Sequence, residues 1–571
     1  MALMGAVVLV VSAPMLVTSS GFALDFTNHL WLAWVAGKAL VASGHPSYFL
    51  NTSQLGVFYP LFAFYGGTLY AATGGLSELL GGHAVLAYVG VTMLAIGGCY
   101  GGILWIGRQF GLRGWLAHAP AVTVVTSAYY ITDLYGRGAW PELVAISAIA
   151  PLIASGIHLV RVERWQVWPV LIFVVSVVLF SGSHNITLVW GTTMIALALL
   201  VMWLVLGMPR RLPYRRLTMV AGLGAVSLMV NAWFLVPDVA YQGDVIAHFT
   251  SKFSWATTSF FNTPAMLLNP LRAVPGQTIP SLFVQSPVWF LTWGLVTGLV
   301  LLSRRGSGGL RRAWVAMAML VALVLTMIMT KPFWELVPSP LNEIQFPYRL
   351  CSYIFYAVAG LVLVAALALQ RATRERPQWI VKGLRLSLVA VAAISLGLCI
   401  WQEAVPNTLL PKSYSERDQA LASVNTLPRS WYDGGSYRDV HAPLIAVPPG
   451  RFLTIDPHQV RGDRFAAWMN VPPGPEPIQT NIEGGDYLVQ LSGLRWMGRN
   501  LEGEAVVQRV NGGSGPVHVI VETRHSLTIA LGQAMSVLAL LAIVAVIAGV
   551  TIRARRARRL GDVVSRSGAP H

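Results

Sequence analysis

The sequence has few charged residues, only three cysteines, and none of the common nucleotide-binding or hydrolase motifs. Only 11% of its 571 residues are charged, against about 25% in an ordinary soluble domain. Cys99, Cys351 and Cys399 all lie in apolar segments, so they offer neither a disulfide framework nor a metal site. The chain also lacks a P-loop, a dinucleotide-binding fingerprint, and the HExxH and GxSxG motifs. Soluble-nucleotide chemistry and hydrolase chemistry are therefore unsupported.

Apolar residues dominate instead, at 55% of the chain. They recur in runs of about 20, each long enough to cross a hydrocarbon layer of about 30 Å as a helix. We therefore predict an all-α polytopic membrane bundle of about 12 transmembrane helices. The predicted spans are residues 3–19, 85–106, 116–132, 142–160, 166–182, 186–207, 217–236, 286–303, 313–330, 348–369, 385–402 and 526–551.

The net charge of +16 is unevenly distributed among the loops. Seventeen Lys and Arg residues lie in five alternate short loops, against six in the short loops between them. The positive-inside rule places these five loops and both chain ends in the cytoplasm. We interpret the charge as a sign of topology and of contact with anionic lipids, rather than of nucleic-acid binding. The basic loops are residues 108–113, 161–164, 210–216, 304–312 and 371–385, and the basic tail is residues 552–571.

Two N-terminal segments allow alternatives. Residues 55–75 as one extra span would break the charge alternation, so we predict a re-entrant or interfacial helix there, or one of a pair of extra spans together with residues 30–43. Residues 1–24 could be a cleaved signal peptide, because small residues follow the apolar run. No Lys or Arg precedes that run, however, which favours an uncleaved first helix.

Residues 403–525 differ from the rest, because charged residues, prolines and glycines return and apolar runs shorten to strand length. We predict an extracytoplasmic β-rich domain here, resembling a β-sandwich. It follows a transmembrane module, 1–402, with extracytoplasmic loops 20–84 and 237–285, and precedes the last span, 526–551. The loop 237–285 is a candidate lid or wall over a lipid-facing site. The clearest predicted strands are residues 451–455, 486–491, 505–510 and 517–522.

Asp25 is the first candidate site residue, because it directly follows the first span at the predicted outer face. If the next segment is helical, Asp25 and His29 stand one turn apart on one face. The alternative is that Asp25 is only the N-cap of that helix, since Asp is a preferred capping residue.

A second candidate group is the outer loop that contains Asp133, Arg137 and Glu142. Glycines on both sides of Arg137 let a ligand or backbone approach closely. The alternative is an ion pair from Arg137 to Asp133 or Glu142 that fixes the loop.

Glu343 and Arg349 flank Pro347 at the outer start of another span. Proline suits a first helical turn, and helix-start amides near Arg349 favour an anion. The alternative for Arg349 is snorkelling to lipid phosphate. His184, at a further outer helix end, adds a polar group on the same side.

Taken together, these features resemble the polytopic glycosyltransferases of the C-type fold (GT-C). Within them, the chain is most similar to bacterial membrane proteins named after 6-pyruvoyl-tetrahydropterin synthase. The resemblance covers roughly residues 1–370. It is carried by Asp25 with Asn28 and His29, Gly44–Pro46, Tyr59–Tyr65, Arg137–Ala139 with Glu142, and Gln345–Arg349.

The resemblance implies that Asp25 is the catalytic base, since the acidic residue of the first outer loop generally has this role in such enzymes. Many members carry a second acidic residue nearby, whereas here Asp25 stands alone until Glu78. A divalent metal ion is therefore unsupported, and no cofactor is expected.

The implied reaction is an inverting transfer of a sugar from a polyprenyl-phosphate donor to a cell-envelope glycan or glycolipid acceptor outside a bacterial plasma membrane. Arg137 and Arg349 would bind the carrier phosphate, because guanidinium binds phosphate bidentately. His29, Glu142, His184 and Glu343 would complete the substrate site. The preference for Arg over Lys suits a high-GC genome, in which arabinose and mannose carriers are common, so an arabinosyltransferase or a mannosyltransferase is expected. The competing interpretations are a transporter or flippase of lipid-linked saccharides and a noncatalytic membrane scaffold.

Overall fold

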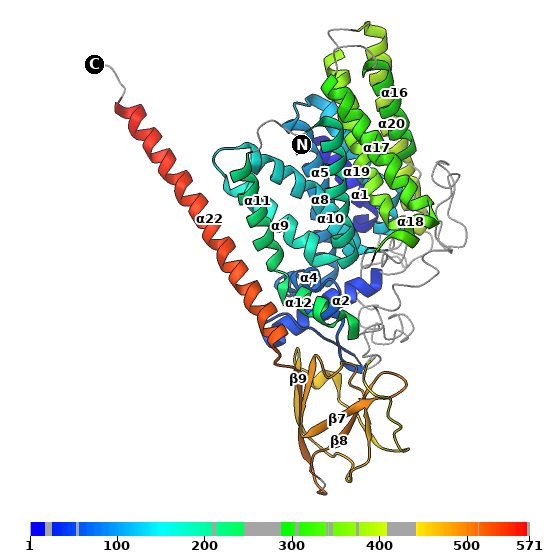
Figure 1. Ribbon diagram of the computed structural model, residues 1–571, viewed down its shortest axis with the longest axis vertical. Helices are drawn as coiled ribbons and strands as arrows, with labels where there is room; N and C mark the ends of the chain where they lie inside the picture. The colour runs from blue at the N-terminus through cyan, green and yellow to red at the C-terminus, as the bar shows by residue number, and fades with distance from the viewer. Residues whose placement is uncertain are drawn as a thin grey trace.

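The chain is a mostly helical, multi-pass membrane protein with a β-sheet region near its C-terminus (Figure 1). A long bundle of helices occupies one end of the molecule and the β-strands occupy the other. The computed structural model describes residues 2–17, 26–52, 56–136, 138–207, 213–244, 287–302, 308–338, 341, 347–372, 376–407, 441–511 and 513–567.

Seven helices in these described ranges are long and apolar enough to cross a membrane. They include α5 (Ala84–Gln109), α8 (Trp140–Arg161), α10 (Asn185–Leu206), α17 (Gly308–Met329), α19 (Cys351–Ala372) with the turn before it, α20 (Gln378–Asn407) and α22 (Leu527–Ser567). A further pair, α11 (Tyr214–Met229) and α12 (Ala232–Tyr241), would make an eighth span but is bent by 75°. Every predicted span coincides with a helical segment, but the count of 12 is not confirmed. The remaining segments are shorter, and they are α1 (Ala2–Val17), α6 (Ala119–Val125) with η1 (Gly114–His118), α9 (Val167–Ser183) and α16 (Pro287–Leu302).

The prediction of one continuous helix over residues 116–132 is wrong. The helix α6 ends at Val125, and a separate short helix, α7 (Ala128–Ile131), follows. Ser127 between them has extended backbone, with φ −70° and ψ 144°, so the hydrogen-bond ladder is interrupted there. A π-helical turn, η2 (Thr132–Gly136), continues the segment.

The described residues that flank or belong to the predicted basic loops lie at the end of the bundle away from the β-strands (Figure 1). Their polar side chains and backbone groups join the ends of neighbouring helices. These contacts are Arg161 to the Gln109 carbonyl, Arg216 to that of Arg161, Arg312 to that of Leu206, Arg376 to that of Val300, and the Arg113 amide to the Gln370 side chain. The start of α1 and the end of α22 also lie away from the β-strands. Assignment of this end to the cytoplasm stays a prediction.

Two helices near the β-strands cross closely and lie outside the set of candidate spans. They are α2 (Phe26–Ser43) and α4 (Gly67–Leu79). Gly37 and Gly74 meet at the crossing, where a Cβ atom on Gly74 would overlap the Gly37 backbone. Residues 56–75 hold a strand and two helices, α3 (Leu61–Phe64) and the start of α4, rather than one long helix. A single extra span over this segment is therefore not supported, and its interfacial or re-entrant position stays a prediction.

The C-terminal β-region contains two sheets. One has the order β3-β5-β8-β7 and the other β4-β9-β6. Each of the four predicted strands overlaps an observed strand, although only two residues of 451–455 are in a strand and the strand within 486–491 begins at Val489. The bounds are β3 (Phe452–Leu453), β4 (Arg464–Met469), β5 (Ile478–Thr480), β6 (Val489–Ser492), β7 (Leu494–Arg499), β8 (Ala505–Arg509) and β9 (Val517–Thr523). The preceding helix α20 continues to Asn407, past the predicted boundary at residue 403.

A hairpin from the N-terminal third of the chain joins the helical bundle to the β-region. Its strands are β1 (Leu50–Thr52) and β2 (Gly56–Tyr59). The Val57 amide donates to the Asn481 carbonyl at 2.7 Å, and the Glu483 amide donates to the Val57 carbonyl at 2.9 Å. Phe49, Val57 and Phe58 are buried in the same apolar cluster as residues of the two sheets. The hairpin therefore belongs structurally to the β-region. A further short helix, α18 (Lys331–Leu336), follows α17 in the chain.

Candidate functional site

Arg349 lies where a short turn leads into a long apolar helix. The turn η4 (Pro347–Leu350) runs directly into α19, as expected for a proline at a helix start. The Arg349 side chain is 10% exposed, and its Nε lies 3.6 Å from Oε2 of Glu142, whose side chain is 3% exposed. Arg349 is therefore buried and ion-paired within the protein. This contradicts the alternative of snorkelling to lipid phosphate.

Glu142 lies in the first turn of α8, where the helix dipole favours a negative charge. The Tyr129 hydroxyl donates a 2.8 Å hydrogen bond to its Oε1, while its Oε2 faces Arg349. The sequence alternative paired Glu142 with Arg137, which lies outside the described residues. The described structure shows that Glu142 pairs with Arg349, more than 200 positions away in the sequence, and the alternative with Arg137 stays a prediction.

Asp133 belongs to the same group of charges. It is 1% exposed and lies in the π-helical turn η2, a rare geometry that often marks functional sites. The turn η2 packs against α8, the helix that carries Glu142. We call Asp133, Glu142 and Arg349, with Tyr129, the charged cluster.

The two candidate histidines lie on either side of a tyrosine. The ring of Tyr65 stacks on His29 at 6.4 Å between centroids and meets His184 edge-on at 5.7 Å. Nδ1 of His29 is hydrogen-bonded to the Tyr70 hydroxyl at 2.6 Å. Both imidazoles are buried, His29 at 7% exposure and His184 at 2%. The sequence prediction that His29 and His184 belong to one region is therefore consistent with the described structure.

His184 also has a local structural role. It is the N-cap of α10, and its Nδ1 accepts a hydrogen bond from the Thr187 amide at 3.2 Å. This contact satisfies one of the amides that a helix start leaves without a helical partner. A structural explanation of His184 thus stands beside its predicted site role.

Aromatic contacts connect the histidines to the helix that carries the charged cluster. Tyr70 contacts Trp140 at 6.0 Å between ring centroids, and Trp140 stacks on Tyr88 at 4.5 Å. The indole of Trp140 also donates to Thr92 Oγ1 at 3.0 Å. Trp140 precedes Glu142 by two residues on α8. The contacts from His29 through Tyr70 therefore reach the first turn of α8, the turn that also carries Glu142.

Three predicted site residues, Asp25, Arg137 and Glu343, lie outside the described residues. Most of the predicted lid, residues 245–285, also lies outside them. Their roles stay predictions.

Sequence analysis missed Tyr65, Tyr70 and Tyr129 as partners of the candidate residues. Tyr65 ends the stretch that carries part of the family resemblance, so it had a local signal. Tyr70 and Tyr129 had none, because their partners His29 and Glu142 are 41 and 13 residues away.

The arrangement is suited to recognising an anion in apolar surroundings. Charged groups are costly at membrane depth and usually face a cavity or a functional site. A guanidinium recognises phosphate or carboxylate through paired donors, and Glu142 can hold it in orientation. Among the described residues, no group of three or more His, Cys, Asp or Glu side chains could hold a metal ion.

No protein-family model matches the chain, and no curated protein matches it. Among solved structures, the chain is similar to the arabinofuranosyltransferase AftD from Mycobacteria, at 16% identity and a TM-score of 0.43. That match covers 85% of this chain and 30% of AftD, so the chain spans about a third of that protein's length.

Two further solved structures have a similar degree of likeness. The archaeal oligosaccharyltransferase AglB from Archaeoglobus fulgidus, in complex with an inhibitory peptide and a dolichol-phosphate, matches at 11% identity and a TM-score of 0.43, over 79% of this chain and 62% of AglB. ArnT from Cupriavidus metallidurans, bound to undecaprenyl phosphate, matches at 14% identity and a TM-score of 0.39, over 90% of this chain and 99% of ArnT. Likeness at this level establishes neither a substrate nor an activity for the chain.

Proposed function

We propose that the chain is a glycosyltransferase that moves a sugar from a polyprenyl-phosphate donor to a cell-envelope glycan or glycolipid on the outer side of a bacterial plasma membrane. The observation that supports this most is the burial of Arg349 against Glu142 at the start of an apolar helix. A buried ion pair is weak evidence for stability, because desolvation offsets its attraction. Its presence in an apolar bundle therefore favours a functional role.

In this proposal, Arg349 and Arg137 bind the phosphate of the donor. The leaving polyprenyl phosphate gains negative charge as the glycosidic bond breaks, and guanidinium groups stabilise that charge. Glu142 and Tyr129 hold Arg349 in position, so the binding geometry exists before the donor arrives. Such preorganisation avoids a reorganisation cost during the reaction.

Asp25 is the proposed base. The acceptor hydroxyl attacks the anomeric carbon and transfers its proton to the carboxylate as the bond to the phosphate oxygen breaks. The attack comes from the face opposite the phosphate, so the configuration inverts and no covalent sugar–enzyme intermediate forms. His29, His184 and Glu343 would complete the substrate site. Arabinose and mannose are both candidate sugars.

The test uses the purified full chain in lipid nanodiscs with polyprenyl-phosphate arabinose and polyprenyl-phosphate mannose. We expect release of polyprenyl phosphate that depends on an added cell-envelope acceptor. Asp25→Asn should abolish transfer with an unchanged melting temperature and unchanged donor binding. Asparagine has nearly the same shape as aspartate but cannot accept the proton of the acceptor hydroxyl.

The same preparation separates the competing functions. Movement of the intact donor across a liposome membrane, with no transfer, would identify a transporter. Absence of both donor binding and transfer would leave the scaffold interpretation. Normal turnover by Asp25→Asn would restrict Asp25 to capping α2.

A further inference from the structure

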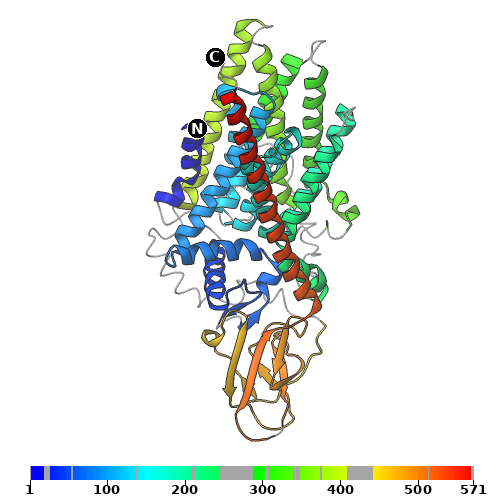
Figure 2. The ribbon, with the colours of Figure 1, turned by 90° about the vertical axis from the view of Figure 1, so that its left-hand side faces the viewer.

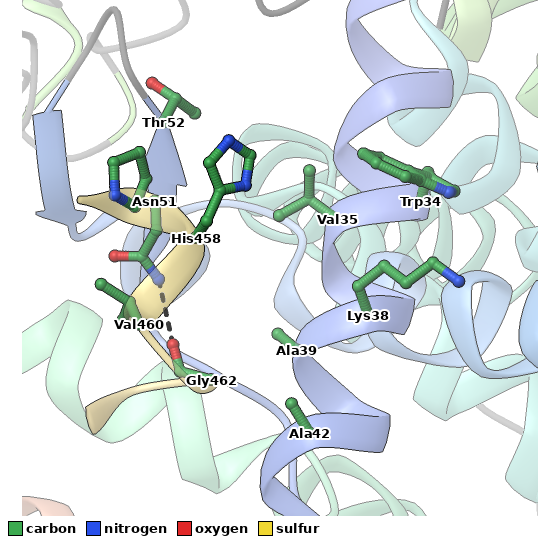
Figure 3. Close-up of a pocket in the computed structure, with 11 residues that line it drawn as sticks. Trp34, Val35, Lys38, Ala39, Ala42, Asn51, Thr52, His458, Val460 and Gly462 are labelled. Atoms are coloured by element: carbon green, nitrogen blue, oxygen red, sulfur yellow. Dashed lines mark hydrogen bonds between the residues drawn. The ribbon is translucent and has the colours of Figure 1, made fainter. Parts of the chain in front are cut away.

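A cavity of about 310 Å³ lies between α2 and the β-region (Figure 3). Trp34, Val35 and Lys38 line it from α2, while His458 lines it from the turn η7 (Pro457–Gln459). Asn51 of the hairpin lies beside His458, across from the helix. The volume of the cavity is at the lower end of the range of about 300–1,000 Å³ typical of small-molecule sites. The charged cluster has no residue in its lining.

Fixed contacts hold the walls of this cavity in place. Asn51 Nδ2 donates to the Gly462 carbonyl at 3.0 Å, and Asn51 Oδ1 accepts from the Phe58 amide at 2.7 Å. Gly462 has φ +63°, and a Cβ atom there would lie 2.6 Å from Cβ of Ser43. Only glycine therefore allows this close approach of the β-region to α2. These contacts hold the hairpin, the β-region and the end of α2 together beside the cavity.

The chemistry of the lining indicates an uncharged ligand with both apolar and hydroxylated faces. Trp34 is partly exposed and supplies a flat apolar surface with a polar N–H. Lys38 is charged, but its ammonium lies 2.9 Å from the Glu78 carboxylate, which offsets the positive charge beside the cavity. His458 is exposed and adds an imidazole. Sugars carry this combination of apolar C–H faces and hydroxyl groups.

We propose that this cavity binds a neutral mono- or disaccharide segment of the acceptor glycan, which is an inference that rests on the proposed function. His29 and Trp34 lie five residues apart on α2, which corresponds to about 7.5 Å along the helix axis. A saccharide seated against Trp34 would thus lie about 7.5 Å along the axis of α2 from the level of His29. The cavity holds the glycan on the aqueous side while its terminal sugar extends towards the membrane.

The experiment measures direct binding of sugars to the full chain in nanodiscs by saturation-transfer NMR. The probes are methyl glycosides of neutral arabinose, mannose and glucose disaccharides, with a uronic-acid disaccharide for comparison. We expect binding of at least one neutral disaccharide, weakened about tenfold by Trp34→Ala and by His458→Ala. Trp34→Phe should retain most of the affinity, since it keeps an aromatic face.

Trp468→Ala is the matched control, because Trp468 is another tryptophan, lies in strand β4 of the β-region, is 73% exposed and does not line the cavity. It should leave binding unchanged. Melting temperatures of all variants exclude loss of fold as the cause.

The proposal is overturned if no neutral disaccharide binds, if the uronic acid binds equally well, or if Trp34→Ala and His458→Ala bind normally. Loss of binding in Trp468→Ala alone would place the sugar on the outer sheet face instead. Asp25→Asn separates this proposal from the proposed function, because it should abolish transfer and leave disaccharide binding intact. Disaccharide binding without any transfer by the unaltered chain would support the cavity and refute the transferase.

Discussion

Arg349 and Glu142 form a buried ion pair, with Nε of the arginine 3.6 Å from Oε2 of the glutamate. The arginine precedes α19 and the glutamate begins α8, so the pair joins the starts of two long apolar helices. Tyr129 binds the other carboxylate oxygen at 2.8 Å. This hydrogen bond orients the Glu142 carboxylate, which in turn faces the proposed phosphate-binding arginine.

The first prediction concerns the energy of this pair. Arg349→Ala should destabilise the protein by about 3–5 kcal/mol, because it leaves the Glu142 carboxylate buried without its cationic partner. Glu142→Gln in the same chain should restore part of that loss, because it removes the buried charge. A double-mutant cycle of unfolding free energies measures the coupling. Additive effects of the two substitutions would mean that the pair contributes nothing to stability.

The second prediction separates phosphate recognition from charge alone. Arg349→Lys keeps a positive charge opposite Glu142 but loses the planar set of donors. The fold should survive, while affinity for a polyprenyl-phosphate sugar falls about tenfold. Donor binding and melting temperature are measured side by side. Unchanged affinity in Arg349→Lys would return this arginine to a structural role.

The third prediction tests the crossing of α2 and α4. Gly74→Val should destabilise the protein by at least about 2 kcal/mol, because its side chain would overlap the Gly37 backbone. The matched control is Gly97→Ala on α5, where an added Cβ atom meets nothing within 4 Å. That substitution should be neutral or stabilising by up to about 1 kcal/mol. Equal melting temperatures of the two variants would contradict the close packing of these helices.

The membrane segments could be predicted because the length of an apolar run is itself the physical requirement for crossing a bilayer. The strands of the β-region were harder to predict from the sequence. The strand β4 reads Arg-Phe-Ala-Ala-Trp-Met, with apolar residues on both faces, so it has no period of two. In β7, a register shift between Trp496 and Gly498 breaks the alternation, so a pattern search fails there.

The candidate site could be predicted only as separate residues. Arg349 and Glu142 both had local signals, namely a proline-started helix and an acidic first turn. Their pairing depends on how α8 and α19 pack, which no local pattern encodes. Arg137 is the basic residue nearest to Glu142 in the sequence, so it was the natural partner to expect. The hydrogen bond between His29 and Tyr70 was hidden for the same reason, since it depends on the crossing of α2 and α4.

The fourth prediction tests the orientation of the chain. All native cysteines are buried, so single cysteines can be added without removing them. Leu501 in the β-region is 87% exposed, and Trp379 at the start of α20 is 75% exposed. A membrane-impermeant maleimide on intact cells should label Leu501→Cys and leave Trp379→Cys unlabelled, with both labelled after permeabilisation. Labelling of Trp379→Cys in intact cells would reverse the proposed topology.

The fifth prediction separates the two roles of His184. As the N-cap of α10 it accepts the Thr187 amide, so His184→Ala should cost about 1 kcal/mol of unfolding free energy. Asparagine is a strong N-cap, so His184→Asn should regain that stability. If the imidazole also contacts substrate, His184→Asn should still transfer sugar more slowly than the unaltered chain, with the loss in kcat/KM and none in melting temperature. Restoration of both stability and transfer by asparagine would show that His184 serves α10 alone and would remove it from the proposed site.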